Sequence, residues 1–184
     1  MRTLLLLICC LTASNAMAWS VEYDDIDKGW YAMEESTQYY NAFVAVYYLP
    51  SAQCAPVLGF ITLLPDAWQE EKAGKRTIKF RVDKGTVWVG EAAYVLEEKD
   101  AGKYNYRQLL GLKLSEDQAH EIMTGSRLLM SPDDTKEDDN TAYPLAGSRR
   151  AMETAKSECF KKLNNNEWDT HTTSQPYSGD EWSI

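Results

Sequence analysis

Two short apolar segments, each ended by a proline, most strongly limit what this chain can fold into. The first spans 42–49 and is followed by Pro50, and the second spans 57–64 and is followed by Pro65. Both are rich in β-branched and aromatic residues, so they predict β-strands. The near-continuous apolar character of 42–49 indicates a strand in the centre of a sheet.

Further strands are predicted by alternating polarity and by polar turns. In 77–82, Ile78, Phe80 and Val82 fall on one face and polar residues on the other, which is typical of a half-exposed strand. The turn Asp83-Lys84-Gly85 then predicts a hairpin. We expect the remaining strands at 86–89, 93–97, 104–114 and 126–130.

Two helices are predicted in the second half of the chain. Ser115 and Gln118 form a capping box before a short helix that ends before Gly125. A longer helix over 148–163 is expected to be capped by Ser148 and to carry one apolar face, made of Met152, Ala155, Cys159 and Leu163. The predicted fold class is α+β and β-dominated. Seven or eight mainly antiparallel strands form a sandwich or partly open barrel, with both helices packed on one side.

The N-terminus has the order of a cleavable secretory signal. Arg2 precedes an apolar run over 4–11, and small residues end in Ala16-Met17-Ala18. The apolar run has about eight residues, whereas a membrane-spanning helix needs about twenty, so we expect no stable membrane anchor. A lipoprotein acylated at Cys9 or Cys10 is the alternative, but Leu-Leu-Ile before Cys9 lacks the small residue expected there. We therefore predict cleavage near Ala18 and a periplasmic or secreted protein.

Cleavage leaves two cysteines, Cys54 and Cys159. In an oxidising compartment they are expected to form one disulfide that ties the C-terminal helix to the sheet. Two buried free thiols are the alternative.

Composition along the chain indicates the domain boundaries, and the net charge indicates the class of partner. Residues 19–29 are predicted to be an exposed acidic lead-in, 30–163 a single β-rich domain and 164–184 a disordered polar tail. The net charge is −9, and loss of Arg2 makes it −10. Such a charge disfavours nucleic acid as a partner and favours a cationic partner or another envelope protein. The oligomeric state stays open.

Motifs for catalysis and for metal binding are missing from the sequence. The mature chain holds two histidines, His120 and His171, with no cysteine or histidine cluster beside either, so we predict no metal site, no catalytic residue and no cofactor. Carboxylates could still perform glycoside hydrolysis, with candidates at Glu34, Glu35, Glu91 and Glu97. With 28 acidic residues, such pairs also arise by chance.

Aromatic residues are the remaining functional signal. Tyr47 and Tyr48 are adjacent, so in a strand they point to opposite faces. Trp168 and Trp182 lie in the polar tail, where they either dock on this domain or contact a partner. Trp68 belongs to the aromatic-rich N-terminal half, whose rings are core residues in the alternative interpretation. These five residues are the predicted partner-binding residues, because aromatic rings are enriched at protein contacts.

The stretch Tyr143-Pro144-Leu145-Ala146-Gly147-Ser148-Arg149-Arg150-Ala151, followed by Cys159, resembles the closing segment of small envelope proteins of the invasion-associated locus B type. The resemblance implies a periplasmic, β-sandwich-like accessory protein without known catalysis. We therefore expect a non-catalytic binding, adaptor or inhibitor protein of the bacterial envelope. A carboxylate-dependent hydrolase of envelope glycan and a small-ligand carrier are the alternatives.

Overall fold

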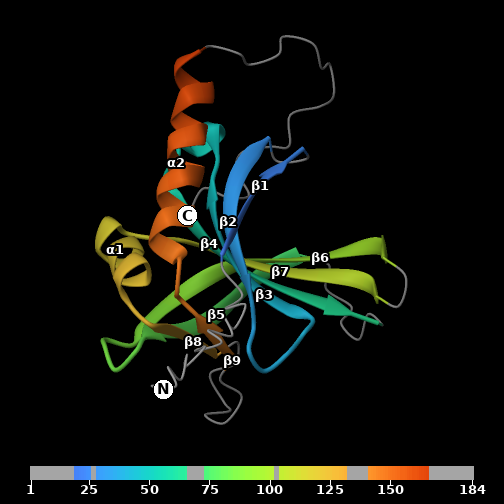
Figure 1. Cartoon of the computed structure of the whole chain (residues 1–184). Helices are drawn as coiled ribbons and strands as arrows, with labels where there is room; N and C mark the ends of the chain where they lie inside the picture. Colours follow the sequence, from blue (N-terminus) through green and yellow to red (C-terminus); the bar gives the residue numbers. More distant parts are fainter. Residues whose placement is uncertain (1–18, 26–27, 66–72, 102–103, 132–140, 166–184) are drawn as a thin grey trace, which may run out of the picture.

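The computed structural model describes residues 19–25, 28–65, 73–101, 104–131 and 141–165 (Figure 1). Within them, nine strands form one antiparallel sheet in the order β1-β2-β3-β4-β7-β6-β5-β8-β9. The strands are β1 (Ser20–Asp24), β2 (Gly29–Glu35), β3 (Ala42–Tyr48), β4 (Pro56–Leu64), β5 (Ala73–Val82), β6 (Trp88–Ala101), β7 (Tyr104–Lys113), β8 (Arg127–Ser131) and β9 (Thr141–Pro144). The helices are the 3₁₀ turn η1 (Pro50–Ala52), α1 (Glu116–Thr124) and α2 (Ser148–Asn164).

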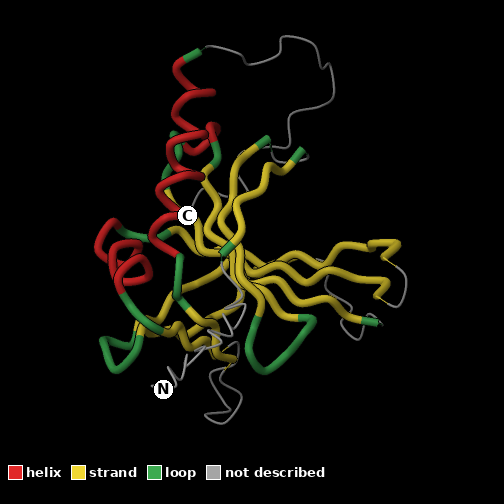
Figure 2. Tube along the Cα trace, in the orientation of Figure 1, coloured by secondary structure: helices red, strands yellow, loops and turns green. Residues whose placement is uncertain are grey.

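The predicted β-dominated α+β class is confirmed, in the form of a partly open barrel. The strands belong to one curled sheet, so the sandwich alternative does not apply. Both helices lie on one side of the strands, and the β6–β7 hairpin extends away from them (Figure 2). We call the face that packs against α2 the inner face and the opposite one the outer face.

The main hydrophobic core fills the inner face. Ile78, Phe80 and Val82 of β5 are buried there, as their alternation predicts. The apolar face of α2 closes this core with Met152, Ala155 and Cys159. β3 is buried on nearly every residue, which agrees with its predicted central position.

The predicted disulfide is present. It joins Cys54, just after η1, to Cys159 in α2, with the two Cα atoms 6.0 Å apart. Because α2 packs on β1, β2 and β3, the bond fixes the helix across the early strands. The capping box of α1 is confirmed too, since the Ser115 hydroxyl accepts from the Gln118 amide and the Gln118 side chain accepts from the Ser115 amide.

Two expectations were wrong, namely the exposed lead-in over 19–29 and the cap of α2 at Ser148. Residues 20–24 form β1 and not an exposed lead-in, because Val21 and Tyr23 face the inner side while the acidic residues between them face outward. Ser148 does not cap α2. The N-cap is Gly147, in the left-handed region with φ 92°, and the Ser148 hydroxyl donates to the Ile122 carbonyl oxygen of α1.

The two edges of the sheet approach each other, which partly closes the barrel. The Thr37 amide after β2 donates to the Ala142 carbonyl oxygen of β9, and the Ala142 amide donates to the Gln38 side chain at 3.1 Å. The indole of Trp19 donates to the Pro144 carbonyl oxygen at 2.9 Å. The first described residue is therefore anchored to the last strand.

Candidate functional site

A second hydrophobic cluster lies on the outer face, away from both helices. Its members are Tyr31, Met33, Phe43, Ala45, Tyr47, Leu49, Val57, Ile61 and Leu109. They come from β2, β3, β4 and β7 and from the residue after β3, so no helix among the described residues contributes to it. We call this set the outer cluster.

The strand register arranges the outer cluster in rows across the sheet. One row runs Glu22, Tyr31, Tyr47, Val57 and Lys113 from β1 to β7. A second runs Glu35, Phe43, Ile61 and Leu109. In the row between them, Met33 of β2 is followed by the small residues Ala45, Gly59 and Gly111. On β3, β4 and β7 the large side chains therefore lie in the two outer rows.

The Tyr47 ring covers part of the row of small residues. A Cβ atom added at Gly59 would lie 2.6 Å from Cε2 of Tyr47, so only glycine lets the ring rest on β4. The Tyr31 and Tyr47 rings are 5.2 Å apart. Aromatic pairs at this separation attract each other beyond simple burial. The two rings form a fixed apolar surface.

Tyr31 ends in a polar contact at the margin of the outer cluster. Its hydroxyl donates to a Glu22 carboxylate oxygen at 2.9 Å. Burial, followed by this hydrogen bond and by the negative charges of Glu22 and Asp24, raises the pKa of Tyr31 to about 12, and the positive charge of Arg107 acts against this rise. The hydroxyl stays protonated at neutral pH and keeps its role as donor.

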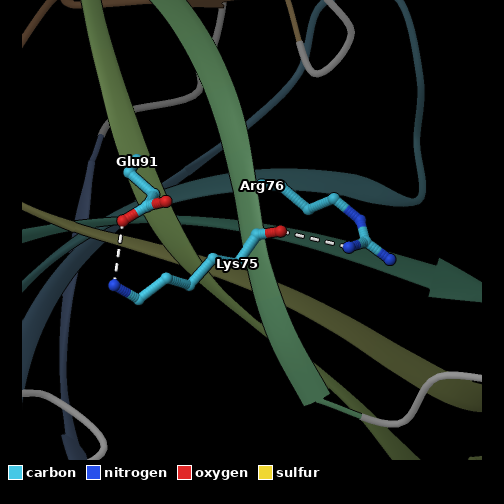
Figure 3. Close-up of polar contacts among 3 residues, drawn as sticks. All are labelled: Lys75, Arg76 and Glu91. Atoms are coloured by element: carbon cyan, nitrogen blue, oxygen red, sulfur yellow. Dashed lines mark hydrogen bonds and ion pairs between the residues drawn. The ribbon is translucent and has the colours of Figure 1, made fainter.

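The margins of the outer cluster carry opposite charges. Glu22 and Asp24 on β1 and Glu35 on β2 form what we call the acidic margin. Arg107 and Lys113 lie six residues apart on β7, and the charge of Arg107 acts on the Tyr31 hydroxyl. We call these two residues the basic margin. Beyond β7, Lys75 of β5 and Glu91 of β6 neutralise each other through an ion pair of 2.9 Å, and Arg76 donates to the Lys75 carbonyl oxygen at 3.1 Å (Figure 3).

The structure separates the two adjacent tyrosines that the sequence singles out. Tyr47 lies on the outer face, in the outer cluster. Tyr48 lies on the inner face, in the main core, with 2% of its surface exposed. The other three predicted partner-binding residues, Trp68, Trp168 and Trp182, lie outside the described residues.

The sequence did not indicate most members of the outer cluster. Met33, Phe43, Ile61 and Leu109 were not named as candidates, although the apolar run over 42–49 carries the relevant signal. A strand that is apolar on both faces needs cover on both faces. In the described part of the chain, helices cover only the inner one.

The described side chains of the candidate carboxylates Glu34, Glu35 and Glu91 lie in three different settings. Glu34 and Glu35 point to opposite faces of β2. Glu91 is held by Lys75, and the side chain of Glu97 lies outside the described region. His120 is exposed on α1. Among the described residues, no group of three or more His, Cys, Asp or Glu side chains could hold a metal ion.

One inner-face carboxylate is unusual. Glu34 is 4% exposed, and its Oε1 atom accepts from the Glu35 amide at 3.1 Å. Its Oε2 atom has no hydrogen-bond partner among the described residues. Burial is the main cause that raises the pKa of Glu34 above its ordinary value, and the charge of Glu35 adds to it, whereas the backbone hydrogen bond acts against it.

Comparison with solved structures gives a coarse likeness of fold. No family model matches the chain, and no curated protein matches it. The fold is loosely similar to the crystal structure of invasion associated protein B from Bartonella henselae, with 13% sequence identity and a TM-score of 0.44. The matched region covers 80% of this chain and 92% of that one. No described helix is both long and apolar enough to span a membrane.

Proposed function

We propose that this chain is an exported, non-catalytic envelope protein that acts by binding another protein through its outer face. The outer cluster carries this proposal. It is an aromatic-rich apolar cluster on the face that the described helices leave uncovered, with a buried centre (Ala45, Tyr47 and Ile61) and half-buried side chains around it. Contact surfaces combine such apolar, aromatic centres with a polar rim.

Two further features support export. The leader over 1–18 has the order of a secretory signal, and the Cys54–Cys159 disulfide requires a compartment in which thiols oxidise. Residues 1–18 lie outside the described region, so the signal peptide and the location remain proposals.

Site-specific photocrosslinking tests the proposed surface. A photoreactive phenylalanine analogue replaces Phe43 in the outer cluster or, as a matched control, Phe160 on the exposed side of α2. We expect irradiation of exported protein to give one discrete protein adduct from position 43. Position 160 should give none.

Two results would contradict the proposal. Position 43 could give no protein adduct at all, or the two positions could give the same set of adducts. In a second arm, Phe43→Ser should lower the yield of an adduct formed from an analogue placed at Tyr31, because the serine removes apolar contact area. An unchanged melting temperature would show that the variant still folds.

A further inference from the structure

We propose that residues 168–173, which follow α2, add to the open edge of β1 as a further strand that runs antiparallel to it. They belong to the stretch that the sequence predicts to be a disordered polar tail, and residues 166–184 lie outside the described part of the chain. The backbone of β1, the end of α2 and the sequence of 168–173 support the proposal. It concerns the edge of the sheet and is independent of the outer cluster.

The strand register shows which backbone groups of β1 point away from β2. Just beyond β2, and in the same register, the Ser36 amide donates to the Ala42 carbonyl oxygen at 2.8 Å. Even-numbered residues of β2 therefore bond to β3, and odd-numbered ones bond to β1. Their partners on β1 are the even-numbered residues. Val21 and Tyr23 thus direct their N–H and C=O groups to the outer edge of the sheet.

This edge is open among the described strands. β1 is the first strand of the sheet and lies beside β2 at its border (Figure 1). Within the described residues, no hydrogen bond from outside the β1–β2 pair reaches the backbone of Val21 or Tyr23. The opposite edge differs, because β9 already bonds to the segment after β2. Open strand edges readily pair with another extended segment, so β1 can accept one.

The end of α2 brings the following residues to this edge. Lys162 donates to the Tyr23 hydroxyl, and its Nζ atom lies 4.5 Å from the centre of the Tyr23 ring. Residues 165–167 then connect the helix to the proposed strand, which is a common length for such a connection. Tyr23 lies near the end of β1. A chain that leaves α2 there and follows the edge runs back toward Ser20, antiparallel to β1.

The sequence of 168–173 suits a short edge strand. It reads Trp-Asp-Thr-His-Thr-Thr, and tryptophan and threonine are enriched in strands. Pro176 follows shortly afterwards and limits how far the pairing can extend, since proline has no amide to donate. The segment thus has about the length of β1, which spans Ser20–Asp24.

The inner face of the sheet offers a place for the Trp168 ring. The rings of Tyr23 and Trp30 lie there, 5.2 Å apart and only half buried. A tryptophan at the start of the added strand extends this aromatic row by one strand, and aromatic pairs between neighbouring strands stabilise a sheet. Thr170 then falls on the same face as Trp168 and directs its backbone groups to β1, because residues opposite Val21 and Tyr23 share their orientation.

Amide hydrogen exchange, followed by NMR on the full mature chain, tests the pairing. The amides of Val21 and Tyr23 should exchange slowly in the parent protein, because the added strand binds them. Thr170→Pro removes a backbone donor that faces β1, so it should speed exchange at both positions about tenfold or more. The Glu22 amide points to β2 and should keep its rate, which distinguishes opening of the edge from unfolding of β1.

The matched control is Ser178→Pro, which places a proline in the same tail but beyond 168–173. It should leave the exchange rates of Val21 and Tyr23 unchanged. Equal rates in the parent protein and in Thr170→Pro would overturn the proposal, and so would an equal acceleration in the two proline variants. Slow exchange that is lost on dilution of about a hundredfold would overturn it too, because pairing within one chain does not depend on concentration.

Discussion

Glu34 shows how much one buried carboxyl group can matter in this barrel. It lies on the inner face of β2, almost fully buried, with one oxygen atom that has no partner among the described residues. An ionised carboxylate in such a place loses hydration without full compensation. Its neutral form therefore fits the folded chain better than its charged form.

The raised pKa of Glu34 predicts a pH dependence of stability with a definite sign. The contribution of a group whose pKa is raised on folding is fully present below the unfolded pKa of about 4.5 and is lost as pH rises through the folded pKa. Glu34→Gln mimics the neutral form, so it should raise the melting temperature at pH 7. The gain should fall toward zero near pH 4.

Thermal melts from about pH 4 to about pH 8 measure this effect. For a chain of this size, a change of about 1 kcal/mol in the free energy of unfolding shifts the melting temperature by about 2–4 °C. Glu153→Gln on the exposed side of α2 is the matched control, because it makes the same change of charge away from Glu34. A Glu34→Gln variant that is less stable than the parent protein at pH 7 would show that the charged form is held by partners.

At the scale of single residues, the sequence predicts on which face of a strand a side chain lies but not how that face is packed. The pattern separates Tyr47 from Tyr48, since adjacent residues in a strand point to opposite faces. It does not show that Tyr48 belongs to the core while Tyr47 rests on Gly59. The difference depends on which face the helices cover, and that is a property of packing between distant segments.

At the scale of elements, α2 holds the early strands together. It packs on β1, β2 and β3, and its Cys159 is bonded to Cys54. Lys162 near its end lies over the Tyr23 ring at 4.5 Å and donates to the Tyr23 hydroxyl. Its first turn is tied to α1 through Ser148. Both halves of the helix thus contact the rest of the fold.

Loss of the disulfide should destabilise the protein without changing its fold. The bond joins residues 105 apart in the sequence. Constraining a loop of that size in the unfolded chain contributes about 2–4 kcal/mol. We expect Cys54→Ala with Cys159→Ala to lower the free energy of unfolding by that amount in urea titrations, with unchanged far-UV circular dichroism.

A reducing agent provides the control. It should lower the stability of the parent protein to that of the double variant, and it should leave the double variant unaffected. Equal stability of the oxidised parent and the double variant would contradict the assigned role of the bond.

Elements with strong local signals are predictable from the sequence, and elements that depend on remote partners are not. The capping box at Ser115 and the alternation in β5 are local, and both appear as expected. β1 was missed because residues 19–29 carry four acidic residues, although Val21 and Tyr23 alternate with two of them inside the strand. The N-terminus of α2 was misjudged because Ser148 bonds to α1, which lies 26 residues earlier in the sequence.

At the scale of the whole molecule, the barrel is partly closed by contacts that β9 makes with Trp19 and with the segment after β2. Ala142 of β9 bonds to the segment after β2, and Trp19 bonds to Pro144. None of these contacts has a local pattern, since they join residues more than a hundred positions apart. The sequence therefore predicts a partly open barrel in general terms but not where its edges meet.

The proposed export and signal cleavage predict a specific mass for the mature protein. The chain isolated from the medium or periplasm should begin at Trp19 and should be two hydrogen atoms lighter than its reduced sequence. Intact-mass measurement before and after reduction tests both points. A chain that retains residues 1–18, or one found reduced in the cytosol, would contradict the prediction.

The position of Cys159 also bears on how the protein is made. A ribosome adds every strand of the described sheet before it reaches α2, so the thiol of Cys54 has to wait until almost the entire polypeptide exists before its partner is available. This order of elements allows the strands to pair through backbone hydrogen bonds and apolar burial before the disulfide forms. The disulfide then stabilises the arrangement that the strands have formed.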